Sequence, residues 1–333
     1  MDSHKKITKI ERALEALERH ETDCALCPRE CHVDRRKGRV GICQSGTRAA
    51  LSHALLHYGE EPVLSGLDDC ANGRQGGTKH GRGSGTVFFT SCNLKCLFCQ
   101  NYQLSWFRQG REVGDEELAE AMLALQDKGA LNINLVSPTH FIIPILRALK
   151  IAYGRGLRIP LISNSNGYEN IDVVEQLAGI VDIYLPDLKY CSPRISKAYS
   201  GAEDYFLHAR QALQEMFVQQ PDFILDKRGI AQRGMIVRHL VLPGNAADSG
   251  AVLEWLARHL SISVPVSLMS QYRPCFRAPE EIQKPLTADE YRAVLGKAEH
   301  LGLETVFVQT EVFETDAHLV PDFNREKPFR WRK

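Results

Sequence analysis

The chain lacks an excess of charge of either sign. Its 333 residues include 41 lysine and arginine residues and 41 aspartate and glutamate residues, so the formal net charge at pH 7 is zero. A protein that binds nucleic acids or membrane surfaces in general would carry a basic excess. We therefore expect neither a nucleic-acid partner nor a membrane partner.

Long apolar runs are also missing. No stretch reaches the roughly 20 apolar residues that cross a bilayer, and the polar start of the chain lacks the apolar core of a signal peptide. In a chain without an export signal, clustered cysteines indicate metal ligands rather than disulfides. We expect a cytoplasmic protein in a reducing compartment.

Seven of the ten cysteines fall in two tight groups, and the later group has the spacing C-x3-C-x2-C. Cys92, Cys96 and Cys99 follow the apolar run 86–90, which predicts a buried strand. A cubane iron–sulfur cluster normally takes four thiolates, so three would leave one iron open to a small molecule. The alternatives are a structural zinc site or three buried thiols. However, no cysteine follows Cys99 until Cys191, and the ferredoxin spacing is absent.

The earlier group contains four cysteines in twenty residues of loop-like sequence: Cys24, Cys27, Cys31 and Cys43. This segment has too little apolar content for a core of its own, and a bound metal would supply the missing folding energy. The spacing favours a metal site over free thiols. Zinc and a second iron–sulfur cluster both remain open, because the C-x2-C pair suits either.

From residue 86 onward, strand-like and helix-like patterns alternate. Strands are expected at 86–90, 132–136, 159–163, 181–185, 235–242, 264–269 and 305–309. Between them, Asp115 can cap one helix and a Thr287–Glu290 capping box can begin another. This alternation predicts an α/β fold with a parallel sheet, and the strand number favours a partial (β/α)6 TIM-like barrel. In such a sheet, ligands bind at the carboxyl ends of the strands.

The chain is divided into three parts. Residues 1–66 are expected to form a helix and a cysteine-rich, metal-binding extension, residues 67–84 a flexible loop, and residues 85–333 the core domain with a C-terminal extension. The paired acids Glu60 and Glu61 before Pro62 fit a solvated turn, although a role close to the cluster is the alternative.

Polar residues follow several of the expected strands. Asp187 and Lys189 are two residues apart, so they share one face of an extended segment. A surface ion pair of little energetic value is the alternative for them. Thr139 fits a helix cap, and His239, a lone histidine on a strand, fits a core residue better than a ligand.

The stretch Gly-Thr-Val-Phe-Phe-Thr-Ser-Cys-Asn-Leu-Lys-Cys-Leu-Phe-Cys-Gln-Asn-Tyr resembles the cluster motif of radical S-adenosylmethionine (SAM) enzymes. It is most similar to the uncharacterised homologues of pyruvate formate-lyase activating enzymes. The resemblance covers most of residues 24–325 and is strongest at 84–105. It implies a [4Fe–4S] cluster on Cys92, Cys96 and Cys99, with SAM's amino and carboxylate groups on the open iron. It also implies reductive cleavage of SAM to methionine and a 5′-deoxyadenosyl radical, which abstracts a hydrogen from a substrate.

The same resemblance suggests which residues hold SAM. Asn164 stands where the family contacts the ribose, and the Asp187-x-Lys189 motif matches the activating enzymes. Lys189 would pair the SAM carboxylate. Many family members hold the amino group with Gly-Gly-Glu, whereas this chain offers Ser137 and Thr139 there.

By analogy, the substrate would be a glycyl position in a partner protein or peptide, and a flavodoxin or ferredoxin would supply the electron. Two other classes stay open: an electron-transfer protein with two iron–sulfur clusters, and a zinc-stabilised binding module.

Overall fold

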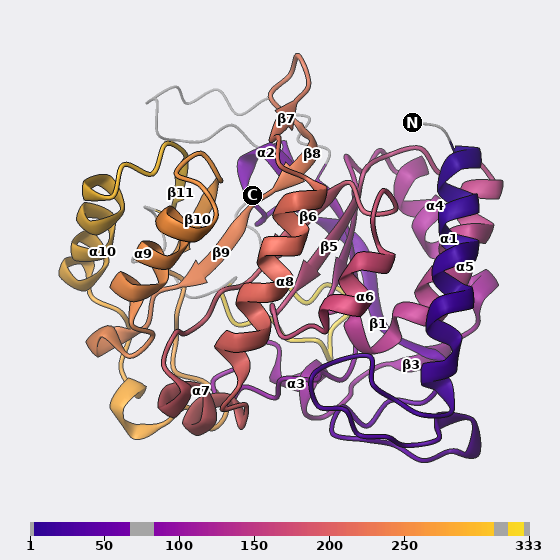
Figure 1. Ribbon diagram of the computed structural model, residues 1–333, viewed down its shortest axis with the longest axis horizontal. Helices are drawn as coiled ribbons and strands as arrows, with labels where there is room; N and C mark the ends of the chain where they lie inside the picture. Colours follow the sequence, from indigo (N-terminus) through magenta and orange to yellow (C-terminus); the bar gives the residue numbers. More distant parts are fainter. Residues whose placement is uncertain (1–2, 67–82, 310–318, 330–333) are drawn as a thin grey trace.

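The computed structural model describes residues 3–66, 83–309 and 319–329. Most of the expected flexible loop, 67–84, lies outside the described residues. Strands form the centre of the molecule and helices surround them (Figure 1). Within the described residues, no helix is long and apolar enough to cross a membrane.

Eleven strands are present in the described residues. They are β1 (Ala49–His57), β2 (Ser84–Phe89), β3 (Arg111–Val113), β4 (Ile133–Val136), β5 (Leu161–Ser165), β6 (Ile183–Pro186), β7 (Ile224–Leu225), β8 (Ala231–Met235), β9 (Val237–Leu240), β10 (Val266–Met269) and β11 (Val306–Val308). The main sheet has the order β3-β1-β2-β4-β5-β6-β8-β7, and a second sheet has the order β11-β10-β9.

The two sheets are joined where β8 runs directly into β9, and together they form one curved sheet. β8 pairs in parallel with β6, and after Ile236 the same stretch continues as β9, which pairs with β10. A bridge between Asp187 and Arg238 also joins the sheets. Strands β2, β4, β5, β6, β8–β9, β10 and β11 follow one another in parallel. The predicted α/β fold, a partial barrel with a cysteine-rich N-terminal region, is confirmed.

One long strand is not predicted by the sequence pattern. β1 lies in the N-terminal extension and pairs antiparallel with β2, with His57 opposite Ser84. β3 then pairs with the other edge of β1. The part of the N-terminal extension that follows its four cysteines therefore belongs to the main sheet.

The helices lie on the outer face of the curved sheet (Figure 1). They are α1 (Ser3–Leu17), α2 (Pro62–Ser65), α3 (Tyr102–Ser105), α4 (Asp115–Asp127), α5 (Ile142–Gly154), α6 (Ile171–Gln176), α7 (Pro193–Ser200), α8 (Tyr205–Gln219), α9 (Ser249–His259) and α10 (Ala288–His300).

The capping box of Thr287 and Glu290 at α10 is confirmed. The cap expected at Asp115 is wrong: Gly114 is the N-cap of α4. Asp115 lies in the first turn, where the helix dipole favours a negative charge.

The short helix α2 is an exception, because it closes the amino end of the barrel from within. Leu64 is fully buried and belongs to one apolar cluster with Ile162 on β5, Ile183 on β6 and Ile236 between β8 and β9. Asn132 donates a hydrogen bond to the Leu64 carbonyl at 2.9 Å. This apolar cluster fills the amino end of the barrel, so a ligand can bind only toward the carboxyl ends of the strands.

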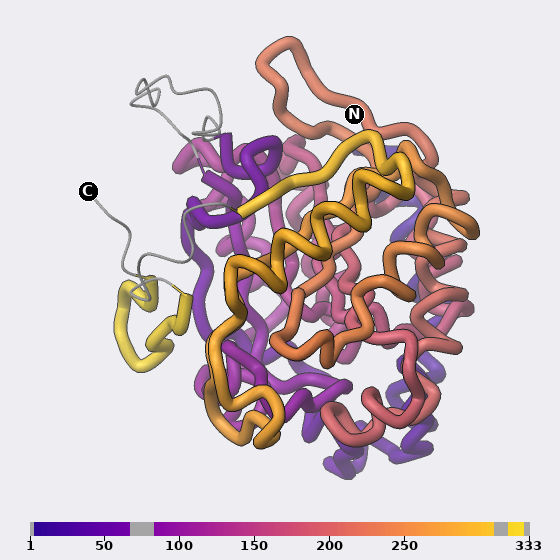
Figure 2. The backbone as a smooth tube through the Cα atoms, turned by 90° about the vertical axis from the view of Figure 1, so that its left-hand side faces the viewer, coloured from indigo at the N-terminus to yellow at the C-terminus, as the bar shows by residue number. Residues whose placement is uncertain are grey.

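The C-terminal residues 319–329 return to the other edge of the barrel, beside β1 and β2 (Figure 2). The rings of Phe323 and Phe329 lie 5.4 and 5.5 Å from that of Phe88 on β2. A ring nitrogen of His53 on β1 is 3.0 Å from the Arg325 carbonyl oxygen. The segment therefore covers the side of the barrel between β11 and β2.

Candidate active site

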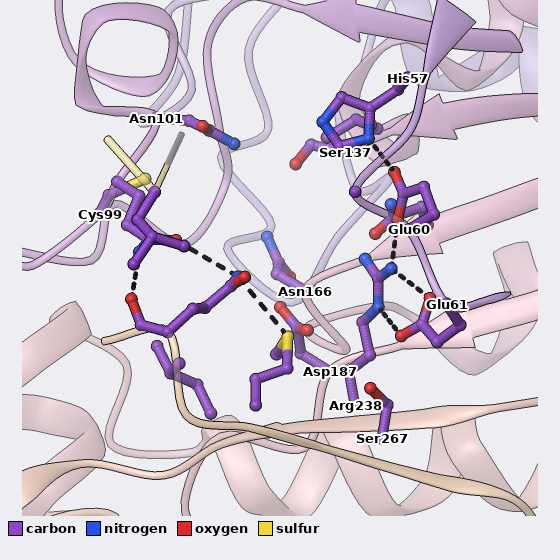
Figure 3. Close-up of a pocket in the computed structure, with 18 of the residues that line it drawn as sticks. His57, Glu60, Glu61, Cys99, Asn101, Ser137, Asn166, Asp187, Arg238 and Ser267 are labelled. Carbon is purple, nitrogen blue, oxygen red and sulfur yellow. Dashed lines mark hydrogen bonds and ion pairs between the residues drawn. The ribbon is translucent and has the colours of Figure 1, made fainter. Parts of the chain in front are cut away.

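Strand alternation explains which side chains enter the barrel. Successive residues of a strand point to opposite faces, so Val237 and His239 join the outer core while Arg238 and Leu240 point inward. The inward side chains near the carboxyl ends line a cavity of about 490 Å³ (Figure 3). The polar ones include Asn164, Asp187 and Ser267.

The three predicted cluster cysteines lie together at one side of this cavity. Cys92, Cys96 and Cys99 all line it, on the loop that directly follows β2. Each sulfur accepts a hydrogen bond from a neighbouring side chain. The donors are Asn166 for Cys92 at 3.4 Å, Ser200 for Cys96 at 3.2 Å and Ser105 for Cys99 at 3.3 Å. Such donors outside the ligand shell orient metal-binding groups and tune the metal.

The chemistry of these sulfurs fits a multi-iron cluster. Burial raises the pKa of Cys96, and raises that of Cys99 to about 12, so a cationic group is needed to hold them as thiolates. Among the described residues, no three histidine, cysteine, aspartate or glutamate side chains converge on one point as the ligands of a single metal ion would. This holds for the four N-terminal cysteines as well. The fit of Cys92, Cys96 and Cys99 to a cluster rests instead on their C-x3-C-x2-C spacing and on their position along the cavity.

Lys189 and Asp187 meet at the end of β6, as their spacing predicts. Lys189 Nζ lies 2.5 Å from Asp187 Oδ2, and both side chains line the cavity. Burial alone would lower the pKa of Lys189, but the Asp187 carboxylate raises it above its ordinary value. The side chains are 16% and 21% exposed, so this pair belongs to the cavity wall rather than to the outer surface.

The turn after β5 holds Asp187 in position. Gly167 has a φ of +78°, and a Cβ there would lie 2.3 Å from the Asp187 carbonyl oxygen. Glycine is therefore required where the Asn166-Gly167 turn passes the end of β6. The Tyr205 hydroxyl lies 3.0 Å from the carbonyl oxygens of Asn166 and Asp187, and so joins the two strand ends.

The other predicted SAM contacts divide into two groups. Asn164 and Ser137 line the cavity, and the backbone amide of Ser137 donates to the Asn164 carbonyl at 2.8 Å. Thr139 is buried outside the cavity lining and donates to Glu169 at 2.6 Å. The structure therefore brings Asn164 and Ser137, but not Thr139, together with the cysteines, Asp187 and Lys189.

A buried charged group occupies the cavity wall across from Cys99 (Figure 3). Arg238 donates to both carboxylate oxygens of Glu61, at 2.8 and 2.6 Å, and also to Glu60. Asn134 donates to Glu60 at 2.9 Å, and His57 lies 3.4 Å from it. Burial acts to raise the pKa of Glu60, but Arg238 and His57 hold it well below its usual range. The solvated turn expected for Glu60 and Glu61 is wrong, because their side chains are only 6% and 5% exposed.

Arg238 is a charged cavity-lining residue that the sequence pattern does not reveal, because its neighbour His239 is the more conspicuous candidate. His239 is fully buried, lies 2.8 Å from Ser249 Oγ and 2.7 Å from the Leu188 carbonyl oxygen. Burial lowers its pKa to about 4. Both of its ring nitrogens have hydrogen-bond partners, so His239 is a core residue, as its sequence context predicts. Arg238 could have been identified from its cross-strand neighbour. It is bridged to Asp187 on the adjacent strand, and neighbouring residues of two paired strands point to the same face, which for Asp187 is the inner face.

The four N-terminal cysteines lie near the cluster loop but do not line the cavity. Burial raises the pKa of Cys27 to about 12, and the thiols of Cys43, Cys24 and Cys31 act in the same direction. All four are free thiols. A metal bound by them stays a prediction.

Arg29 joins this segment to the cluster loop. Its guanidinium donates to the carbonyls of Asn93 at 3.0 Å and Leu94 at 3.2 Å, and to those of Ser200 at 3.0 Å and Gly201 at 2.5 Å. It thus connects the cysteine-rich segment to the residues between Cys92 and Cys96 and to the Ser200 that contacts Cys96.

Together, the partial barrel, the three cavity-lining cysteines and the adjacent Lys189–Asp187 pair define an iron–sulfur protein that binds a small molecule at its cluster. Residues 86–217 match the Radical SAM superfamily and form a radical SAM domain. Radical SAM proteins are enzymes, and the family implies a [4Fe–4S] cluster and SAM. The chain is also similar to the uncharacterized protein MJ0674 of Methanocaldococcus jannaschii. The two are 28% identical over 297 residues, which cover 86% of this chain and 77% of the relative.

Proposed function

We propose that the protein is an activating enzyme that uses SAM-derived radical chemistry to remove a hydrogen from a glycyl residue of a partner protein. The observation that carries the proposal is that one cavity brings together three cysteines suited to a cluster and the Lys189–Asp187 pair. When bound, the cluster supplies the electron that cleaves SAM to methionine and a 5′-deoxyadenosyl radical. The resemblance to activating enzymes supports the glycyl substrate.

The residues of the cavity have separate tasks in this proposal. Lys189 donates to the carboxylate of SAM, and Asp187 accepts from its ammonium group, because opposite charges in a half-buried site form strong charge-assisted hydrogen bonds. Asn164 hydrogen-bonds to the ribose hydroxyls. The C-terminal residues Leu319 and Phe329, which line the cavity from the side, exclude water from the reacting centre.

The size of the cavity favours a substrate whose reacting group is small. Pockets of roughly 300–1,000 Å³ hold one drug-sized ligand, so a volume of about 490 Å³ is largely filled by SAM. A second reactant must then enter as a narrow segment. A glycyl residue has no side chain and needs the least room.

The test has two stages. The protein is loaded with iron and sulfide under anaerobic conditions, reduced with dithionite and given SAM, and 5′-deoxyadenosine is measured. The reaction is then repeated with a dialysed macromolecular extract of cells grown on α-deuterated glycine. We expect deuterium in the 5′-deoxyadenosine. Deuterium transfer from the low-molecular-weight fraction instead would replace the glycyl partner by a small substrate.

The two alternative classes of protein, an electron carrier with two iron–sulfur clusters and a zinc-stabilised binding module, predict different results in the first stage of this test. An electron carrier with two clusters would take up iron but would neither bind nor cleave SAM. A zinc-stabilised binding module would retain zinc and take up no cluster at Cys92, Cys96 and Cys99.

A further inference from the structure

A surface of aromatic and basic side chains covers the outside of the cluster loop. We define this aromatic–basic patch as Tyr102, Trp106, Phe107, Arg108, Phe276 and Arg277. The rings of Tyr102 and Phe276 stack at 5.2 Å, and the Phe276 ring lies 5.3 Å from Trp106 and 5.7 Å from Phe107. The Arg277 guanidinium lies 5.1 Å from the Phe276 ring and 5.6 Å from that of Trp106.

The patch is open to solvent although it is rich in aromatic rings. Phe107 is 57% exposed and Arg108 and Arg277 are also exposed, whereas the other three aromatic residues of the patch are half-buried. Phe276 has a φ of +54°, a backbone conformation that is costly for a bulky residue. Exposed aromatic and arginine side chains are enriched at protein–protein interfaces. These features favour a surface that another protein covers.

The patch is linked to the cluster loop by hydrogen bonds. Trp106 Nε1 donates to the Cys96 carbonyl at 3.1 Å, and the Arg277 backbone amide donates to the Leu97 carbonyl at 3.0 Å. Ser105, directly before Trp106, contacts the Cys99 sulfur. None of the six patch residues lines the cavity. The patch is therefore hydrogen-bonded to the loop that carries the cysteines without lining the cavity itself.

The charge of the patch indicates the kind of partner. Within the described ranges, neither Arg108 nor Arg277 forms an ion pair with a carboxylate. Arg108 Nη1 contacts only the Gln44 carbonyl, at 3.5 Å. The half-buried Lys95 adds a third positive charge, with Nζ 5.3 Å from the Trp106 ring. Uncompensated positive charge beside exposed rings is complementary to a partner with an acidic rim.

We propose that the aromatic–basic patch is the docking site of a small acidic one-electron carrier, a reduced flavin or iron–sulfur protein. This inference rests on the proposed function, because SAM cleavage needs one electron from outside. In the docked pair, the carrier is oxidised by one electron and the cluster is reduced by one electron; no bond is made or broken. A protein substrate is not the expected occupant, because it must reach the cavity, and none of the patch residues lines it.

The test compares two charge reversals in the cluster-loaded full chain. The patch variant carries Arg108→Glu and Arg277→Glu. The matched control carries Lys227→Glu and Arg258→Glu, the same charge change at exposed positions on the β7–β8 hairpin and the carboxyl end of α9. Binding of an oxidised flavodoxin is measured by calorimetry at two salt concentrations. Cluster reduction is followed by absorbance with reduced flavodoxin and, separately, with dithionite.

We expect the patch variant to bind flavodoxin at least about tenfold more weakly and to lose most of the salt dependence. Its reduction by flavodoxin should slow by a similar factor while its reduction by dithionite stays unchanged. The control should match the unmodified protein. If the double glutamate variant does not take up a cluster, Arg108→Gln with Arg277→Gln takes its place, and about a threefold weaker binding is then expected.

Unchanged flavodoxin binding in the patch variant, or an equal loss in the control, would overturn the inference. It would also be overturned if flavodoxin reduction were normal while transfer of deuterium from the macromolecular fraction disappeared, since the patch would then bind the substrate. Absence of SAM cleavage with dithionite in the unmodified protein is a different failure, because it defeats the proposed function itself.

Discussion

The two groups of cysteines look alike in sequence but differ in their surroundings. Cys92, Cys96 and Cys99 follow a parallel strand, line the cavity and each accept a hydrogen bond from a side chain. The N-terminal four lie in loops outside the cavity lining. Among them, Cys31 accepts a bond from the Ile42 backbone amide at 3.4 Å, and Cys43 accepts one from the Arg35 side chain at 3.6 Å.

This difference separates catalytic from structural cysteines better than spacing does. A thiolate set can support chemistry only where a reactant can approach it, and the carboxyl ends of the strands provide that space. The N-terminal group instead has backbone packed close to its sulfurs: a Cβ on Gly41 would lie 2.5 Å from Cys31 Sγ. We therefore expect the first group to be essential for activity and the second to contribute stability.

The largest effect should come from the cavity cysteines. Replacing Cys92, Cys96 or Cys99 by alanine should abolish SAM cleavage and the absorbance of the site-differentiated cluster, because one iron loses its only protein ligand. The measurement is 5′-deoxyadenosine production after anaerobic reconstitution. Cys275→Ala, which changes a free thiol outside both groups, is the control. Full cleavage by any one of the three variants would make the cluster assignment untenable.

The second prediction concerns the metal of the N-terminal group. In a full chain that carries alanine at Cys92, Cys96 and Cys99, elemental analysis should still find one metal site. Further replacement of Cys27 should remove that metal and lower the thermal stability, because structural metal binding is coupled to folding. A metal-free triple variant under both zinc and iron loading would show that the N-terminal cysteines are only thiols.

Lys189 tests whether the cavity, and not only the cysteines, belongs to the site. Loss of a charge-assisted hydrogen bond costs about 1.5–3 kcal/mol, so Lys189→Ala should weaken SAM binding about 10- to 100-fold and keep the cluster. Lys189→Arg should recover little, because the planar fork does not replace a point donor. The control is Lys197→Ala, whose ion pair with Glu203 is exposed. An unchanged dissociation constant by calorimetry would place SAM elsewhere.

The smallest effect should be seen at the contact between the two regions. Arg29→Ala removes the hydrogen bonds to carbonyls next to Cys92 and Ser200, and we expect a loss of about 1–2 kcal/mol in the free energy of unfolding, since the side chain is only half-buried. Denaturant unfolding of the apo-protein measures it, with Arg12→Ala on exposed α1 surface as the control. Equal stability of the two variants would mean that the cysteine-rich segment is not held by Arg29.

Local patterns predicted much of this molecule. The parallel strands lie within a few residues of their expected positions, because they are short apolar runs whose residues are mostly buried on both faces. The caps were less reliable, since the one expected at Asp115 is wrong and the one at Thr287 is right. The cluster cysteines could be predicted because their spacing and the preceding strand are contiguous in sequence.

Long-range partners could not be predicted in this way. The contact of Arg238 with Glu60 joins residues 178 positions apart, and no local pattern encodes it. The burial of Glu60 and Glu61 depends on α2 entering the barrel, while the position of β1 depends on its antiparallel pairing with β2. Likewise, the Thr139 hydroxyl could have bound SAM by its chemistry, but in the structure it donates a hydrogen bond to Glu169. Which face a residue occupies was decided by the register of its strand.

Cleavage of SAM in the cavity beside Cys92, Cys96 and Cys99 can be measured directly as the formation of 5′-deoxyadenosine. The anaerobically reconstituted full chain is reduced with dithionite in the presence of SAM. We expect 5′-deoxyadenosine and methionine in equal amounts, and neither product when Cys96 is replaced by alanine. A protein that holds a reduced [4Fe–4S] cluster yet neither binds nor cleaves SAM would contradict this expectation.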